Sequence, residues 1–321
     1  MPLTRTAVTA ARRQRLASSW RSPDPARRDA GSGRPPPRVG MGYAMGRNNQ
    51  GPIAVDQFTR IHGTRIRYRT LGSGPPLLLM HGLGASLELW DPLLPFLEGF
   101  TVVLMDHPGA GLSATPTRPM TMRRYAHVAH GLLGHLQLRD VAVLGLSFGG
   151  MVAQELARAA PQRVSRLVLV CTSCGWGSVP GGLAALAAVG TPLRYHSPAY
   201  MKMVAPILYG GGIDRAAQVQ ASQAEARLAY PPSTLGYFAQ LTAAWTWSSR
   251  PYLRRLCVPT LVVSGSEDPV IPAANGRILA GLIGGAQYFE VDGGGHLCLL
   301  DAAERVAPRI TAFLRNDAGG D

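Results

Sequence analysis

The sequence predicts an α/β fold in which helices cover both faces of a mostly parallel sheet. Short apolar runs with the length of buried strands alternate along the chain with segments of helical spacing. These strand candidates are apolar throughout, as strands covered on both faces are. The chain has 321 residues and is 46% hydrophobic, which is enough for one large core.

The first part of the chain supplies a hairpin, two strands and a helix. Residues 55–69 alternate apolar and polar side chains around a glycine turn, which predicts an opening β-hairpin. Residues 77–80 and 101–105 are apolar runs and are predicted strands. Apolar side chains then recur at helical spacing over residues 125–136, with Thr121 as the predicted N-cap.

The second part continues the alternation with one interruption. Its predicted elements are a strand at 141–144, a helix at 151–157 that Pro161 ends, strands at 164–170, 260–265 and 286–291, and a final helix at 302–314. Between about residues 175 and 250 the strand pattern stops, and aromatic residues and glycine runs replace it. We expect a helical lid, inserted near the middle of the chain, over the active edge of the sheet.

Gly145-Leu146-Ser147-Phe148-Gly149 lies between a predicted strand and a predicted helix. Strand, G-x-S-x-G and helix form the context of a nucleophile elbow, whose strained turn exposes the serine hydroxyl above the sheet edge. Small residues on either side let the strand and the helix approach closely. Ser147 is therefore the candidate nucleophile, although such a pentapeptide also arises by chance in a glycine-rich chain.

A serine nucleophile needs a histidine base and a carboxylate that orients the histidine. Asp268 and His296 each follow one of the last two predicted strands, in the chain order that this arrangement requires. Both come to the edge where ligands bind in open α/β sheets. Glu267 is the rival carboxylate, and we prefer Asp268 because Pro269 stiffens the turn directly after it.

The same edge carries a candidate oxyanion hole. His81-Gly82-Leu83-Gly84 follows a predicted strand and is similar to the H-G-G-G-type loop that contributes one backbone N–H. We assign the two donors to the N–H groups of Leu83 and Phe148, where negative charge would develop. Singly, these residues also fit ordinary roles, such as a turn serine, a helix cap or a buried histidine. Their joint occurrence at strand ends favours a catalytic site.

The predicted lid, residues 176–249, is rich in tryptophan and tyrosine. Trp176, Tyr209 and Trp245 are the candidate substrate-binding residues, on the hypothesis that aromatic side chains line a pocket for an acyl chain. The alternative is that they only pack the lid onto the core. The sequence does not separate these two roles.

Residues 1–50 form a predicted leader before a core at 51–175 and 250–317. The leader has ten arginines, two aspartates and few large apolar residues, so we expect it to be disordered. It has no apolar region of the kind that a secretory signal needs. An arginine-rich arm resembles a transit peptide or a contact for nucleic acid or anionic lipid. Alternatively, translation begins at Met41 or Met45.

Charge and cysteine content bound the other function classes. The formal charge is +13, of which the leader carries +8, and the remaining +5 or so is ordinary for an enzyme and predicts no nucleic-acid partner. The longest uncharged stretch, residues 167–193, is broken by glycine and proline and predicts no transmembrane span. Cys171 and Cys174 end a strand, so we interpret them as buried thiols. Because no disulfide is needed, a cytoplasmic location is expected.

The chain after residue 52 resembles the α/β-hydrolase superfamily, and more closely the intracellular polyhydroxyalkanoate depolymerases of the medium-chain-length type. The passages that carry the closer resemblance are residues 81–89, 206–212, 245–248 and 268–272. The resemblance implies that Ser147 is the nucleophile, Asp268 the orienting acid and His296 the base. Phe148 departs from the tryptophan that the family often has there, which leaves pocket shape and substrate length open.

The predicted function is a serine carboxylic-ester hydrolase that acts through an acyl-enzyme, with a small ester or a polyester as substrate. The resemblance implies a depolymerase-like esterase, for which association with polymer granules is a further expectation. No metal or organic cofactor is expected. Alternatives on the same fold are a C–C bond hydrolase, an acyltransferase or another small-ester esterase or lipase. An alternative of another class is a non-catalytic binding protein.

Overall fold

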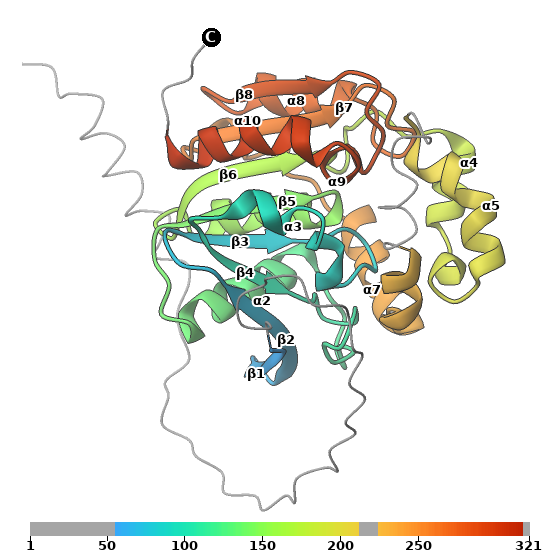
Figure 1. Ribbon diagram of the computed structural model, residues 1–321, viewed down its shortest axis with the longest axis horizontal. Coiled ribbons are helices and arrows are strands. Elements are labelled where there is room, and N and C mark those ends of the chain that lie inside the picture. The colour runs from blue at the N-terminus through green and yellow to red at the C-terminus, as the bar shows by residue number, and fades with distance from the viewer. Residues whose placement is uncertain (1–54, 212–223, 317–321) are drawn as a thin grey trace, which may run out of the picture.

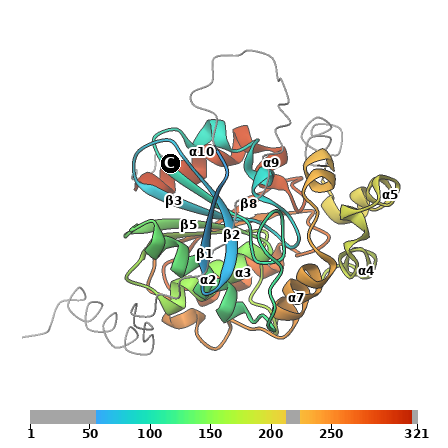
Figure 2. The same ribbon diagram turned by 90° about the horizontal axis from the view of Figure 1, so that it is seen from below.

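The computed structural model describes residues 55–211 and 224–316. The predicted leader and Gly212 lie outside the described residues. One sheet of eight strands runs through the described part, in the order β1-β2-β4-β3-β5-β6-β7-β8. Helices lie on both of its faces (Figures 1 and 2), which confirms the predicted α/β architecture.

Every predicted strand is present. The strands are β1 (Gln57–Ile61), β2 (Thr64–Leu71), β3 (Pro76–Met80), β4 (Thr101–Met105), β5 (Val141–Leu146), β6 (Val164–Val170), β7 (Thr260–Gly265) and β8 (Gln287–Val291). β1 and β2 form the predicted antiparallel hairpin, and β2 pairs antiparallel with β4. From β4 to β8 all neighbours pair parallel. The carboxyl ends of these parallel strands therefore meet at one edge of the sheet.

The helices include the predicted ones and several short turns that the sequence did not indicate. They are η1 (Leu87–Trp90), η2 (Leu94–Leu97), α2 (Met122–His135), α3 (Phe148–Ala159), α4 (Leu183–Val189), η3 (Pro192–Tyr195), α5 (Pro198–Tyr209), α7 (Thr234–Trp245), η5 (Leu253–Arg255), α8 (Ala274–Leu282), α9 (Cys298–Asp301) and α10 (Ala303–Arg315). Thr121 caps α2 as predicted, because its hydroxyl accepts the N–H of Arg124 at 3.3 Å. Four-residue turns such as η1 are too short to give a periodic pattern.

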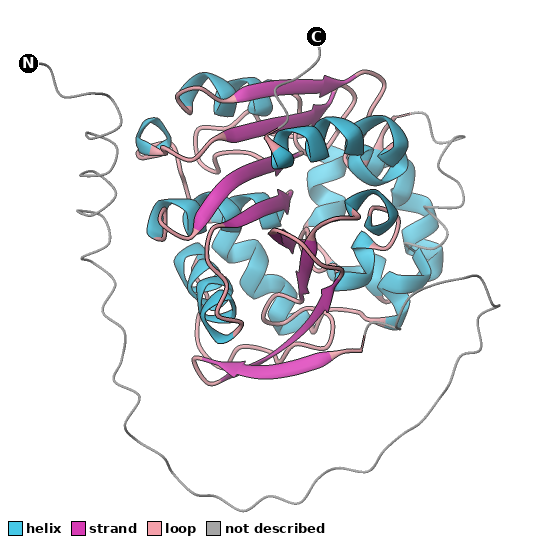
Figure 3. Ribbon diagram, turned by 60° about the vertical axis from the view of Figure 1, so that its left-hand side comes forward, coloured by secondary structure: helices cyan, strands magenta, loops and turns pink. Residues whose placement is uncertain are grey.

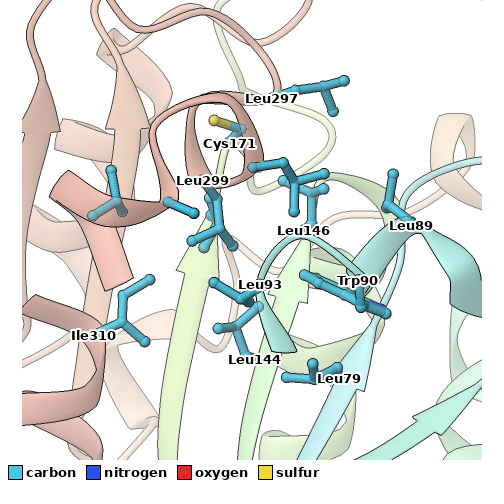
Figure 4. Packing of buried hydrophobic residues seen from close by; sticks show 14 of the residues in the cluster. Leu79, Leu89, Trp90, Leu93, Leu144, Leu146, Cys171, Leu297, Leu299 and Ile310 are labelled. Carbon is cyan, nitrogen blue, oxygen red and sulfur yellow. The ribbon is translucent and has the colours of Figure 1, made fainter. Parts of the chain in front are cut away.

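The core has two halves, one on each face of the sheet. Consecutive residues of a strand point to opposite faces, so Leu79 packs with η1, η2 and α10, whereas Leu78 packs with α2 and α3. In the first half, Trp90 and Ile310 lie around the strands (Figure 4). Both faces of the parallel strands are covered, which explains why their sequences are apolar throughout.

The segment between β6 and β7 supplies α4, η3, α5 and α7, which lie beside the carboxyl edge of the sheet (Figures 1 and 3). Its two ends are joined, because Gly175 forms a β-bridge with Ser248 and the Trp176 N–H donates to the Trp247 carbonyl at 3.0 Å. We call residues 176–249 the lid segment, and its boundaries stay a prediction. No helix among the described residues has the length and hydropathy to cross a bilayer.

Candidate active site

Ser147 lies on the sharp turn between β5 and α3, with φ 54° and ψ −117°. A positive φ in a serine costs about 1–3 kcal/mol and persists only where the surroundings enforce it. Two glycines allow the turn: a Cβ on Gly145 would lie 2.4 Å from the Gly149 carbonyl oxygen, and one on Gly149 would lie 2.0 Å from the Met80 carbonyl oxygen. Close backbone packing therefore holds Ser147 at the edge of the sheet, where it lines a cavity.

His296 contacts both Ser147 and Asp268. Its Nε2 lies 3.1 Å from Ser147 Oγ, and its Nδ1 lies 2.7 Å from Asp268 Oδ2. The other oxygen of Asp268 accepts the N–H groups of Val270 and Ile271 at 2.9 and 2.8 Å. Because a carboxylate holds the Nδ1–H, Nε2 is left as the acceptor for the serine proton.

The exit loops of β5, β7 and β8 thus bring the three predicted side chains together. Asp268 and His296 are both buried, so their hydrogen bond is stronger than it would be in water. Glu267, the rival carboxylate, has an exposed side chain, although its backbone N–H donates to Gly294 at 2.9 Å. Asp268, and not Glu267, therefore lies within hydrogen-bond distance of His296.

The predicted oxyanion donors, Leu83 and Phe148, line the same cavity as Ser147 and His296. Phe148 is the first residue of α3, a position whose N–H has no intrahelical acceptor. His81 is a buried residue of the loop that carries Leu83, and its ring contacts the backbone of this loop. Burial lowers the pKa of His81 to about 4, so its ring is neutral at pH 7.

A neutral imidazole has one donor and one acceptor, and His81 uses both on backbone groups. Its Nδ1–H donates to the Gly82 carbonyl at 2.9 Å, and its Nε2 accepts the N–H of His107 at 3.3 Å. This is the buried histidine that the sequence left as an alternative, and its contacts join the loop of the predicted donor Leu83 to the backbone of His107.

The lid segment contacts the oxyanion loop directly. The N–H of Gly84 donates to Gln240 Oε1 at 2.8 Å, and the Leu83 carbonyl accepts the hydroxyl of Tyr195. Gly84 has a φ of +70°, and a Cβ there would lie 2.8 Å from the ring of Tyr237. No sequence motif indicates these contacts, because they join residues more than 100 positions apart.

Of the three predicted substrate-binding residues, the structure brings only Tyr209 to the cavity. The Tyr209 carbonyl also accepts the N–H of His296 at 2.7 Å. Trp176 and Trp245 do not line the cavity: they are 68% and 70% exposed, and the Trp176 indole N–H donates to the Trp245 carbonyl at 2.7 Å. Both lie near the ends of the lid segment, which the bridge between Gly175 and Ser248 draws together on the surface.

Among the described residues, Cys171, Asp268 and His296 form the one group whose donor atoms are close enough to hold a metal ion. The group does not fit a metal well. Asp268 and His296 already bond each other, and the hydrogen bond with Cys298, together with burial, raises the pKa of the Cys171 thiol well above its usual value. A cysteine binds a metal ion as the thiolate. Cys171 is therefore better described as one of the buried thiols that the sequence predicted.

Comparisons with known proteins agree with this architecture. The poly(3-hydroxyalkanoate) depolymerase of Ectopseudomonas oleovorans is 38% identical over 243 residues, which are 75% of this chain and 85% of that protein. The structure of the enol-lactonase from Burkholderia xenovorans LB400 matches with a TM-score of 0.71 at 27% identity, covering 81% of this chain and 100% of that one. A hydrolase from Pseudomonas aeruginosa PA01 matches with a TM-score of 0.67 at 29% identity, covering 81% and 98%. Residues 75–303 match the family model described as alpha/beta hydrolase fold, and the chain belongs to that family.

Proposed function

We propose that this chain is a serine-dependent carboxylic-ester hydrolase that acts through an acyl-enzyme on 3-hydroxyalkanoate polyester or its oligomers. The observation that carries the proposal is the series of contacts from Ser147 Oγ to His296 Nε2 at 3.1 Å and from His296 Nδ1 to Asp268 at 2.7 Å. A nucleophile, a base and an orienting acid in this order are the parts that acyl transfer needs.

In the proposed reaction, Ser147 Oγ attacks the ester carbonyl while His296 Nε2 takes its proton. The oxyanion forms against the N–H groups of Leu83 and Phe148, an interaction worth about 3–4 kcal/mol of barrier for each donor in well-studied enzymes. His296 then protonates the leaving alcohol, and the acyl group stays on Ser147. Water attacks this ester, His296 takes the proton of the water, and the free acid leaves.

The substrate class rests on two observations. A relative with 38% identity is named a poly(3-hydroxyalkanoate) depolymerase. The wall of the cavity is largely aliphatic and includes Leu146, Met151, Leu208 and Val270, which suits the alkyl side chain of a hydroxyacyl unit. A cytoplasmic location and an association with polymer granules stay predictions.

Two experiments test the proposal. A fluorophosphonate probe should label the wild type and the control Ser165→Ala, whose exposed serine lies at the opposite end of the sheet from the site, and should not label Ser147→Ala. Labelling of Ser147→Ala would mean that another serine is the nucleophile. The second experiment compares polymer granules with short nitrophenyl esters, and cleavage of the small esters alone would remove the polyester claim.

A further inference from the structure

Two buried arginines of the lid segment line the same cavity as Ser147 and His296. Arg194 comes from η3 and Arg227 from the helical residues 224–229, and each is 6% exposed. A guanidinium stays charged at every pH that proteins meet, and burial of such a charge without a carboxylate costs several kcal/mol. The presence of two of them in the wall of the cavity that Ser147 also lines therefore points to a ligand.

Arg227 has little compensation within the described residues. Its guanidinium lies over the ring of Tyr209, 4.9 Å from the ring centroid, and no hydrogen bond or ion pair within 4.0 Å joins it to another described residue. Asp301 is a carboxylate that interacts with Arg227 electrostatically. Burial raises the pKa of Asp301 to about 6, and the charge of Arg227 acts in the opposite direction. Within residues 55–211 and 224–316, nothing accepts from the five N–H donors of Arg227, which lines the cavity and can donate to a group that enters it.

Arg194 is only partly compensated. Its Nη1 donates to the Tyr237 hydroxyl at 2.6 Å and to the Ala188 carbonyl at 3.3 Å, and its guanidinium lies over the rings of Tyr195 and Tyr237 at 4.8 and 5.2 Å. The N–H groups on Nε and Nη2 have no acceptor among the described residues. Aromatic rings stabilise a cation by about 0.5–2 kcal/mol, less than a carboxylate partner at the same site.

Arg67 serves as a comparison, because it is a buried arginine whose charge is balanced by carboxylates of the chain. Its side chain is 0% exposed, and it forms ion pairs with Asp56, Glu88 and Asp106. Among the described residues, neither cavity arginine forms an ion pair, although Asp301 lies near enough to Arg227 to interact with it electrostatically. The contrast indicates that Arg194 and Arg227 are kept for an anion that the described chain does not supply.

We propose that Arg194 and Arg227 bind a carboxylate of the substrate, so that the enzyme prefers 3-hydroxyacyl oligomers with a free acid end. This inference rests on the proposed function and names the substrate of the same cavity. Hydrolysis of the ester next to the acid end breaks the bond between the acyl carbon and the oxygen of the terminal unit. That unit leaves as a hydroxyacid with a proton from His296, and water then releases the acyl group from Ser147.

The first test compares the kcat/KM of the wild type on a 3-hydroxyalkanoate dimer with a free carboxylate and on the methyl ester of the same dimer. A charge-assisted hydrogen bond to the carboxylate predicts a preference for the acid of about ten- to a hundredfold. Equal values, or a preference for the methyl ester, would overturn the inference without the use of any variant.

The second test assigns the preference to these residues. Arg227→Met and Arg194→Met should each lower the ratio of acid to methyl ester toward one, and Arg227→Lys should retain part of it. Arg254→Met is the matched control, because it removes the same charge from an exposed position outside the cavity. A ratio that falls equally in Arg254→Met would assign the preference to net charge, against the inference.

The third test separates binding from chemistry. Calorimetric titration of Ser147→Ala should give at least tenfold tighter binding of the acid than of the methyl ester. Selective binding in Ser147→Ala, combined with a wild type that neither cleaves esters nor reacts with the fluorophosphonate, would reject the proposed function and keep the carboxylate site. Cleavage of both dimers at equal rates by the wild type would keep the proposed function and reject the carboxylate site.

Discussion

The sheet edge and the lid segment contribute to the site in different ways. The loops that leave β3, β5, β7 and β8 carry the proposed oxyanion loop, nucleophile, acid and base, each within a few residues of a strand end. The lid segment supplies none of these groups. It contacts the backbone of these loops, since the Tyr209 carbonyl accepts the N–H of His296 and the side-chain Oε1 of Gln240 accepts the N–H of Gly84.

Each part of the site is therefore determined by residues close to it in the sequence, whereas the exact relative positions of the parts depend on distant contacts. The strain at Ser147 is enforced by glycines two residues away. The loops of His296 and Leu83 instead form hydrogen bonds with lid residues that lie far from them in the sequence. Substitutions at the sheet edge should therefore remove chemistry, and substitutions at the lid contacts should reduce it by smaller factors.

The largest effect is expected for Asp268→Asn. An amide in place of the carboxylate favours the wrong tautomer of His296, and comparable substitutions lower kcat by about 10⁴-fold. Esterase assays on purified protein measure the loss. Glu267→Gln, one residue away on the exposed side of the loop, should leave kcat within about twofold, since exposed substitutions rarely matter. A larger loss in Glu267→Gln than in Asp268→Asn would mean that the acid is misassigned.

A smaller effect is expected for Gly295→Ala, which breaks the contact between the histidine loop and the lid segment. The new Cβ would lie 1.8 Å from the Tyr209 carbonyl oxygen, so the backbone must move. Displacement of a catalytic group by about 1 Å can lower kcat about a hundredfold. The control is Gly284→Ala, where nothing lies within 4 Å of a new Cβ. Unchanged kcat in Gly295→Ala would show that this contact does not position His296.

The same difference explains which features the sequence could predict. The strands, the elbow and the order of Ser147, Asp268 and His296 follow from short-range patterns: apolar runs, turn residues and their position after strands. The three side chains lie within hydrogen-bond distance of one another because the parallel strands end at one edge of the sheet. Such patterns involve residues that are close together in the sequence, so they can be predicted without the structure.

The lid contacts could not be predicted in this way. Aromatic content favours Trp176 and Trp245 as pocket residues. Their burial depends on how the ends of the segment meet, however, and the bridge between those ends leaves both side chains on the surface. Arg194 and Arg227 are two among many arginines in the sequence. Only the fold distinguishes them, because a buried cation is recognised by its surroundings and not by its neighbours in the chain.

The smallest effect is expected for Gln240→Leu, which tests the contact between the lid segment and the oxyanion loop. The side chain of Gln240 is fully buried and joins two loops, since its Oε1 accepts the Gly84 N–H at 2.8 Å and its Nε2 donates to the Pro108 carbonyl at 3.3 Å. Leucine has a similar volume but leaves both backbone groups without a partner. The expected loss in the free energy of unfolding is about 1–3 kcal/mol, measured by urea denaturation.

The effect of Gln240→Leu on catalysis should be about tenfold in kcat, because a loosened Gly84 weakens the neighbouring Leu83 donor without removing it. Gln287→Leu, at an exposed position of β8, is the control for the loss of an amide. A loss of stability with unchanged kcat would show that the lid segment holds the fold and not the oxyanion loop. A tenfold loss of kcat at full stability would instead make Gln240 a positioning residue alone, and it would strengthen the contrast between a locally determined nucleophile and an oxyanion loop held from a distance.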